Sequence, residues 1–219
     1  MELICKAILF DLDGVLINSS SVVERHWERW AISHDVSFKH VMEVAHGRTS
    51  AEIVRLVAPH LDAEQEGRNR EAAEGIDTKG LEVYASAYDL LRGLPAGSWA
   101  VVTSGNLQTA TTRLRYGDFT PPPILITADD VRRGKPEPEA YLLAAQGLGV
   151  SPEQCVVIED APAGIEAAHA AGMHTIAVAT THPPKALSKA DIIAFELTSV
   201  LVKKEGKQLL VIVEPMHSV

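Results

Sequence analysis

Short apolar runs alternate with helix-like segments through most of the chain. From residue 99 onward the runs are nearly continuous in apolar side chains, and the segments between them repeat apolar residues with a helical period. Such strands are typical of a parallel sheet covered by helices on both faces. Because parallel strands need right-handed crossovers, we expect an α/β fold with a Rossmann-like, doubly wound parallel sheet. The expected strands are residues 6–10, 99–103, 123–127, 155–160, 174–179 and 191–194, the expected helices are 86–94, 106–116, 137–147 and 162–171, and a hairpin with its turn at Glu205-Gly206 is expected over 202–214.

Residues 18–83 interrupt this alternation. They contain three helical patterns, SSVVERHWERWAIS, TSAEIVRLVAPHL and DAEQEGRNREAAEG, and no convincing strand. We interpret them as a helical insert, so that the Rossmann-like core is formed by residues 1–17 and 84–219. Trp27 and Trp30 are three residues apart on one helix face, and we expect them to pack inside the insert.

Composition excludes some classes of protein. Of the 219 residues, 46% are apolar and 22% are charged. A chain of this length and apolar content can bury a core without needing a disulfide. The net charge of −9 argues against a general nucleic-acid binder but allows a local positive site for a small anion.

No segment is long and apolar enough to span a bilayer, and the N-terminus enters a strand pattern without a signal-peptide leader. Cys5 and Cys155 lie beside apolar runs and lack zinc-ligand spacing, so we expect two buried thiols. We therefore expect a soluble cytoplasmic protein, monomeric or a small homo-oligomer, with neither nucleic-acid nor membrane partners.

Two carboxylates follow the first expected strand. Asp11 and Asp13 are separated by a single residue, and the period of two in a strand places them on roughly the same side. Carboxylates this close repel each other and lose hydration when buried, so a bound divalent cation would stabilise the pair.

Further polar residues follow the other expected strands. In an open α/β sheet the carboxyl ends of the strands form the ligand crevice, so these side chains should converge. Carboxylates can hold Mg²⁺, and a hydroxyl with an ammonium can hold a phosphoryl group beside it. The residues concerned are Thr103, Ser104, Lys135, Glu159 and Asp160.

These residues carry a family resemblance. DLDGV (11–15), VVTSG (101–105), Lys135 in RGKPEPEAY and VVIEDAPAGIEAA (156–168) resemble, in order, the four motifs of the haloacid dehalogenase-like (HAD) superfamily. The insert is similar to the C1-type helical cap of that family. The resemblance covers nearly the whole chain and implies phosphoryl transfer.

The resemblance implies a role for each motif residue. Asp11 would be the nucleophile that forms an aspartyl-phosphate, and Asp13 the general acid and base. Thr103 and Lys135 would bind the phosphoryl oxygens. The cofactor implied is Mg²⁺, and the residues implied to hold it are Asp11, Asp13 through its backbone carbonyl, Asp160 and, through water or directly, Glu159.

A narrower resemblance concerns the substrate. Stretches at 46–59, 98–106, 126–150 and 156–181 look like glycerol-3-phosphate and 2-deoxyglucose-6-phosphate phosphatases and related sugar-phosphatases. This implies a small sugar- or polyol-phosphate substrate. The residues expected to contact it are Ser104, Gly105, Asn106 and, from the insert, Arg48, with His46 a weaker candidate.

Other functions stay open at this point. Haloacid dehalogenases lack an acid two residues after the nucleophile, so Asp13 favours phosphoryl transfer. A sugar phosphomutase similar to β-phosphoglucomutase would use the same residues and return the phosphoryl group to sugar. A non-catalytic phosphate-ligand binding protein would have no need for Asp13.

Overall fold

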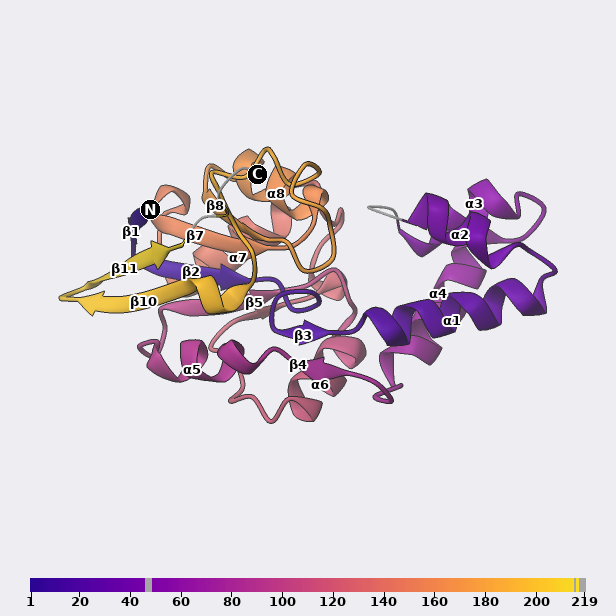
Figure 1. Cartoon of the computed structure of the whole chain (residues 1–219), viewed down its shortest axis with the longest axis horizontal. Helices are drawn as coiled ribbons and strands as arrows, with labels where there is room; N and C mark the ends of the chain where they lie inside the picture. The colour runs from indigo at the N-terminus through magenta and orange to yellow at the C-terminus, as the bar shows by residue number, and fades with distance from the viewer. Residues whose placement is uncertain (46–48, 215, 217–219) are drawn as a thin grey trace.

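The computed structural model describes residues 1–45, 49–214 and 216, and contains a central six-stranded sheet. Every neighbouring pair in this sheet is parallel. The doubly wound α/β fold that the sequence predicts is therefore confirmed (Figure 1). In spatial order the strands are β6 (Leu125–Ile126), β5 (Trp99–Val102), β2 (Ala7–Phe10), β7 (Cys155–Glu159), β8 (His174–Val178) and β9 (Ile192–Ala194).

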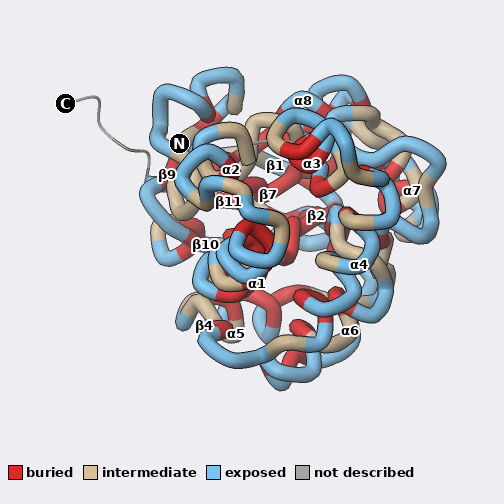
Figure 2. The backbone as a smooth tube through the Cα atoms, turned by 90° about the vertical axis from the view of Figure 1, so that its right-hand side faces the viewer, coloured by how far each residue is buried: buried red, intermediate tan, exposed pale blue. Residues whose placement is uncertain are grey.

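Helices cover both faces of the sheet, as nearly continuous apolar strands require. Ile8 and Phe10 of β2 point into a cluster that includes α5 (Ala85–Gly93) and α6 (Leu107–Tyr116). Ala7 and Leu9 point the other way, toward α7 (Glu139–Leu148) and α8 (Pro162–Ala170). Figure 2 shows the burial that results, with β2 and β7 buried and the outer helix faces exposed. Short 3₁₀ turns lie at Ala128–Asp130, Pro152–Gln154 and Leu197–Ser199.

Four helices form a separate layer beyond the carboxyl end of β2 (Figure 1). They pack around Trp27 and Trp30, which are both buried and meet edge to face at 5.5 Å, as the sequence predicts. The second of these helices was not predicted, since none of the three helical patterns covers its residues. The helices are α1 (Ser20–Ser33), α2 (Phe38–Ala45), α3 (Ser50–Val57) and α4 (Ala63–Gly75).

The expectation that the insert contains no strand is wrong at its two ends. β3 (Ile17–Asn18) and β4 (Glu82–Val83) form a short antiparallel pair where the chain enters and leaves the helical layer. Two residues are too few to give an alternating pattern in the sequence.

A second, antiparallel sheet packs beside the core. The C-terminal hairpin is confirmed as β10 (Val200–Glu205) and β11 (Gln208–Val213), but its turn is Gly206-Lys207 because Glu205 still pairs with Gln208. β1 (Glu2–Cys5) was not predicted; it pairs with β11 and is buried only on one side. Among the described residues, no helix has the length and apolar character needed to cross a membrane.

Candidate active site

The carboxyl ends of the central strands bring the candidate residues together. Asp11 directly follows β2, Thr103 follows β5, and Asp160 follows Glu159, the last residue of β7. Lys135 reaches the same point from the loop after β6. Because the strands are parallel, these ends meet at the edge of the sheet that faces the helical layer (Figure 1).

Lys135 binds two buried carboxylates. Its Nζ lies 2.5 Å from Asp11 Oδ1 and 2.6 Å from Glu159 Oε1, and it also donates to the Val102 carbonyl at 3.1 Å. Burial alone would lower the pKa of Lys135, but the carboxylates of Asp11 and Glu159 raise it well above its usual value. The ammonium therefore stays charged and offsets part of the local negative charge.

Three buried carboxylates form a group that fits a divalent cation. One oxygen each from Asp11, Glu159 and Asp160 lies within 4.8 Å of the others. Burial raises the pKa of Asp11 to about 7, even though Lys135 opposes the shift. Burial and the negative charges of Glu159 and Asp11 raise the pKa of Asp160 well above its ordinary range. Carboxylate oxygens are ligands that Mg²⁺ prefers, and a cation here would relieve this repulsion.

Glu159 makes hydrogen bonds with both of its oxygens. Oε1 accepts from Lys135 and from the Tyr141 hydroxyl at 2.8 Å, and Oε2 accepts from the backbone N–H groups of Asp160 and Ala161 at 3.0 and 3.1 Å. Burial would raise the pKa of Glu159, but Lys135 lowers it below the usual value. These contacts make Glu159 the group that orients Lys135.

The carboxylate of Asp13 has a different environment from that of Asp11. Asp11 and Asp13 line one cavity, but Asp13 Oδ2 pairs with Arg113 on α6, and Asp13 Oδ1 is buried without a hydrogen-bond partner. Burial raises the pKa of Asp13, and the guanidinium of Arg113 opposes the shift. Two carboxylates with separate cationic partners can take separate chemical roles.

Gly14 makes the close packing of this loop possible. Its φ of +80° lies in the left-handed region, and a Cβ at this position would overlap Asp160 Oδ2. The Gly14 carbonyl accepts a hydrogen bond from Thr180 Oγ1 at 2.5 Å, and Asp160 Oδ2 accepts one from Thr181. These contacts fix Asp160 against the loop that carries Asp11 and Asp13.

The loop after β5 forms another side of the site. Thr103 is buried and its Oγ1 accepts from the Gly105 N–H at 3.0 Å, while Ser104 is exposed to the cavity. Asn106 caps α6, since its Oδ1 accepts from the Thr109 N–H at 2.9 Å. Arg48 and His46, the candidates from the insert, lie outside the described residues.

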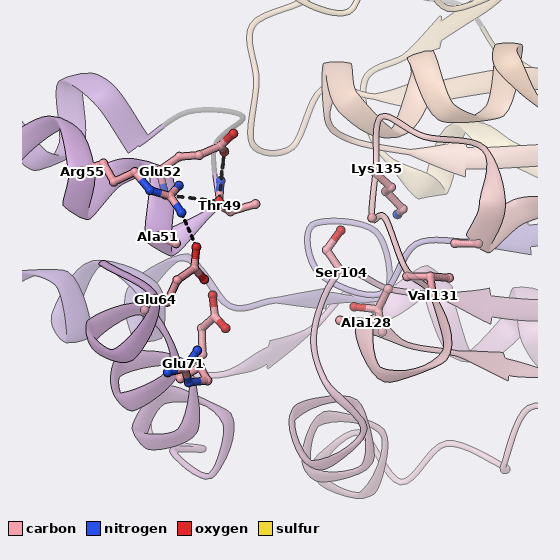
Figure 3. Close-up of a pocket in the computed structure, with 15 residues that line it drawn as sticks. Thr49, Ala51, Glu52, Arg55, Glu64, Glu71, Ser104, Ala128, Val131 and Lys135 are labelled. Carbon is pink, nitrogen blue, oxygen red and sulfur yellow. Dashed lines mark hydrogen bonds and ion pairs between the residues drawn. The ribbon is translucent and has the colours of Figure 1, made fainter. Parts of the chain in front are cut away.

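Two adjoining cavities of about 390 and 380 Å³ separate the sheet from the helical layer. Figure 3 shows side chains of α3 and α4 facing Ser104 and Lys135 across this space. The wall from the helical layer is polar and carries both signs of charge, and its Arg55 and Glu64 form an ion pair. Its polar residues are Thr49, Glu52, Arg55, Glu64, Arg68 and Glu71.

Two further side chains, which were not predicted, contact the site. Tyr141 on α7 binds Glu159, and Arg113 on α6 binds Asp13. Arg113 carried a usable signal, because it lies beside Ala110 and Leu114 on the buried stripe of α6, where a lone arginine needs a carboxylate partner.

The chain is similar to known hydrolases over most of its length. It is 39% identical over 206 residues to hexitol phosphatase A of Escherichia coli (strain K12), which covers 92% of this chain and 95% of that protein. It is 35% identical over 193 residues to glycerol-1-phosphate phosphohydrolase 2 of Saccharomyces cerevisiae (strain ATCC 204508 / S288c), with 83% of this chain and 77% of that protein covered.

Solved structures and a family model agree with these relatives. A HAD hydrolase of family IA, variant 3, from Entamoeba histolytica HM-1:IMSS shares the fold with a TM-score of 0.77 at 22% identity, covering 89% of this chain and 95% of that one. The family model for haloacid dehalogenase-like hydrolases matches residues 5–172. The resemblance stated from the sequence motifs is thus confirmed, and the chain belongs to the haloacid dehalogenase-like hydrolase family.

Proposed function

We propose that this protein is a Mg²⁺-dependent phosphatase that hydrolyses the phosphomonoester of a small sugar or polyol. The observation that carries the proposal is the separation of two neighbouring carboxylates, with Asp11 beside Lys135 and Asp13 beside Arg113. A nucleophile and a general acid need different environments, and this arrangement supplies them.

The reaction has two balanced steps. A carboxylate oxygen of Asp11 attacks phosphorus, the ester P–O bond breaks, and Asp13 donates its proton to the departing alkoxide. Water then attacks the aspartyl-phosphate, Asp13 accepts its proton, and inorganic phosphate leaves. Lys135 and Thr103 bind the phosphoryl oxygens, with the loop residues Ser104 and Gly105 beside them.

The group of three buried carboxylates supports Mg²⁺ as the cofactor. Asp11, Asp160 and the backbone carbonyl of Asp13 would hold Mg²⁺, while Glu159 would act through Lys135. When bound, the cation would supply positive charge that offsets the carboxylates and the phosphoryl oxygens.

The polar wall of the helical layer supports a polyhydroxylated substrate. Its carboxylates and guanidinium groups can exchange hydrogen bonds with several hydroxyls, and no aromatic side chain lines the two cavities in the part of the chain that the structure describes. A relative named hexitol phosphatase, at 39% identity, supports the same substrate class. Arg48 remains a prediction as a further substrate contact.

The test is phosphate release from a panel of hexitol, hexose, deoxyhexose and glycerol phosphates in Mg²⁺ and in EDTA. We expect release that needs Mg²⁺ and is abolished by Asp11→Asn. Asp89→Asn, on the exposed side of α5, is the matched control and should retain the rate. Undiminished phosphate release by Asp11→Asn would refute the assignment of Asp11 as the nucleophile.

The same panel separates phosphatase from phosphomutase. If no ester releases phosphate, a sugar 1-phosphate should be tested for isomerisation with and without the matching bisphosphate. If the bisphosphate accelerates isomerisation and little free phosphate forms, the protein is a mutase and the phosphatase proposal is wrong. Binding of the esters without any turnover would favour a non-catalytic binding protein.

A further inference from the structure

A buried chain of ion pairs joins Asp13 to the helical layer. One nitrogen of the Arg113 guanidinium, Nη1, pairs with Asp13 Oδ2, and the other, Nη2, donates to Glu74 Oε1 at 2.8 Å. Glu74 also pairs with Arg70 one turn earlier on α4. The side chains of Arg113, Glu74 and Arg70 are only 5%, 9% and 8% exposed.

This chain of ion pairs carries no net charge. It contains two carboxylates and two guanidinium groups, and Arg113 lies between the carboxylates. A buried arginine is costly unless it is fully paired. If the Asp13 carboxylate turned toward a substrate, Glu74 would still pair with Arg113. Arg113 would therefore not be left unpaired.

The contact joins two parts of the fold. Glu74 lies in the last turn of α4, the last helix of the helical layer, whereas Arg113 lies on α6 of the core. The helices touch here, since a Cβ on Gly75 would overlap Thr109 Oγ1 of α6. A change in the position of α4 would therefore move Glu74 and, through it, the group that holds Asp13.

We propose that Arg113 is a positioning residue that orients the carboxylate of Asp13 and connects it to the helical layer through Glu74. The proposal rests on the proposed function, in which Asp13 gives a proton to the leaving group. Arg113 does not line the cavity that Asp11, Lys135 and Asp160 share. It lines a neighbouring cavity beside Asp13, where its guanidinium nitrogens are paired with Asp13 and Glu74, so its effect on the reaction would pass through Asp13.

The test uses two esters with enzyme in excess, so that leaving-group release reports the first phosphoryl transfer. The alkyl ester should be the best substrate of the panel, because its leaving alkoxide needs the proton from Asp13. The aryl ester should be p-nitrophenyl phosphate, whose leaving group departs as a stable anion without a proton.

Arg113→Met should slow the alkyl ester about 100-fold, the loss expected of a misplaced catalytic group, and slow the aryl ester less than about threefold. Arg113→Lys keeps the positive charge but lacks the two guanidinium nitrogens that pair with Asp13 and Glu74. It should therefore give an intermediate rate with the alkyl ester. Arg115→Met, on the exposed side of the same helix, is the matched control and should leave both rates unchanged.

A double variant tests whether the effect passes through Asp13. In an Asp13→Asn background, Arg113→Met should add less than about a twofold further loss, because the group that Arg113 orients is already absent. Equal slowing of both esters by Arg113→Met, or full multiplication of the two losses, would overturn the proposal.

Two controls keep the outcome decisive. Circular dichroism and thermal melting identify a variant that does not fold, and Glu74→Gln then replaces Arg113→Met, with a smaller loss confined to the alkyl ester. Asp11→Asn should abolish release from both esters in every background. Activity that survives Asp11→Asn refutes the proposed function itself, independently of Arg113.

Discussion

Lys135 should contribute more to stability than other ion-paired lysines of this chain. Its side chain is 7% exposed and contacts two carboxylates that are 10% and 1% exposed. Replacing it with methionine preserves the apolar stem and leaves Asp11 and Glu159 buried without their cation. Breaking a buried ion pair in this way costs about 3–5 kcal/mol. For a chain of this size that corresponds to a loss of about 6–20 °C in melting temperature.

The assay is thermal unfolding in EDTA, with Lys189→Met as the matched control. Lys189 lies 2.6 Å from Glu166, the same distance as Lys135 from Glu159, but its side chain is 68% exposed. Both variants remove one positive charge, but Lys135 is buried and pairs with two carboxylates, whereas Lys189 is exposed and pairs with one. Exposed pairs contribute about 0.2–1 kcal/mol, and the control should melt within a few degrees of the unchanged protein.

The pH dependence has a definite sign. The pKa of Asp11 is about 7 in the folded chain, above its unfolded value, so Asp11 is largely protonated near pH 5 and charged near pH 8. The loss in Lys135→Met should therefore be larger at about pH 8 than at about pH 5. Equal losses in the two lysine variants, or a larger loss at the lower pH, would refute the reasoning.

Two further predictions concern the acidic group. Gly14→Ala forces a left-handed residue and displaces Asp160, so it should cost about 1–2 kcal/mol and also lower Mg²⁺ affinity, measured by titration calorimetry. Gly97 has a similar φ of +77° and no atom near the position of a Cβ, so Gly97→Ala should lower stability without changing Mg²⁺ affinity. Equal Mg²⁺ affinities in the two variants would contradict the packing argument. Burial raises the pKa of Asp11 and of Asp160, so protons must leave as Mg²⁺ binds. The rise in melting temperature that Mg²⁺ produces over EDTA should therefore grow from about pH 5 to about pH 8. A rise that is constant or shrinks over that range would exclude these carboxyl groups as the ligands.

The sequence predicts the central sheet well because burial on both faces leaves a strong local pattern. β7 begins with four consecutive apolar residues before Glu159, and it is buried along its whole length. The first strand, β1, alternates exposed residues with one half-buried and one buried residue, and its partner β11 lies more than 200 positions away. Such an edge depends on pairing that no local window contains.

The residues of the candidate site also differ in whether the sequence could predict them. Asp11, Thr103 and Asp160 could be predicted because each directly follows a strand, and parallel strands end together. The partner of Asp13 could not, because Arg113 is 100 residues away and reaches Asp13 through helix packing. Sequence spacing therefore predicts where functional groups gather, while packing decides which group orients which.

The position of Glu74 gives this distinction a functional consequence. α4 carries Glu74 at its C-terminal end and, along the same helix, the cavity-wall residues Glu64, Arg68 and Glu71. A helix moves as a rigid body over this length, so a substrate that draws those wall residues toward the core also shifts the partner of Arg113. On the proposed function, recognition of the sugar or polyol and orientation of Asp13 would then depend on one helix. A substrate too short to reach the wall should consequently lose turnover rate as well as affinity.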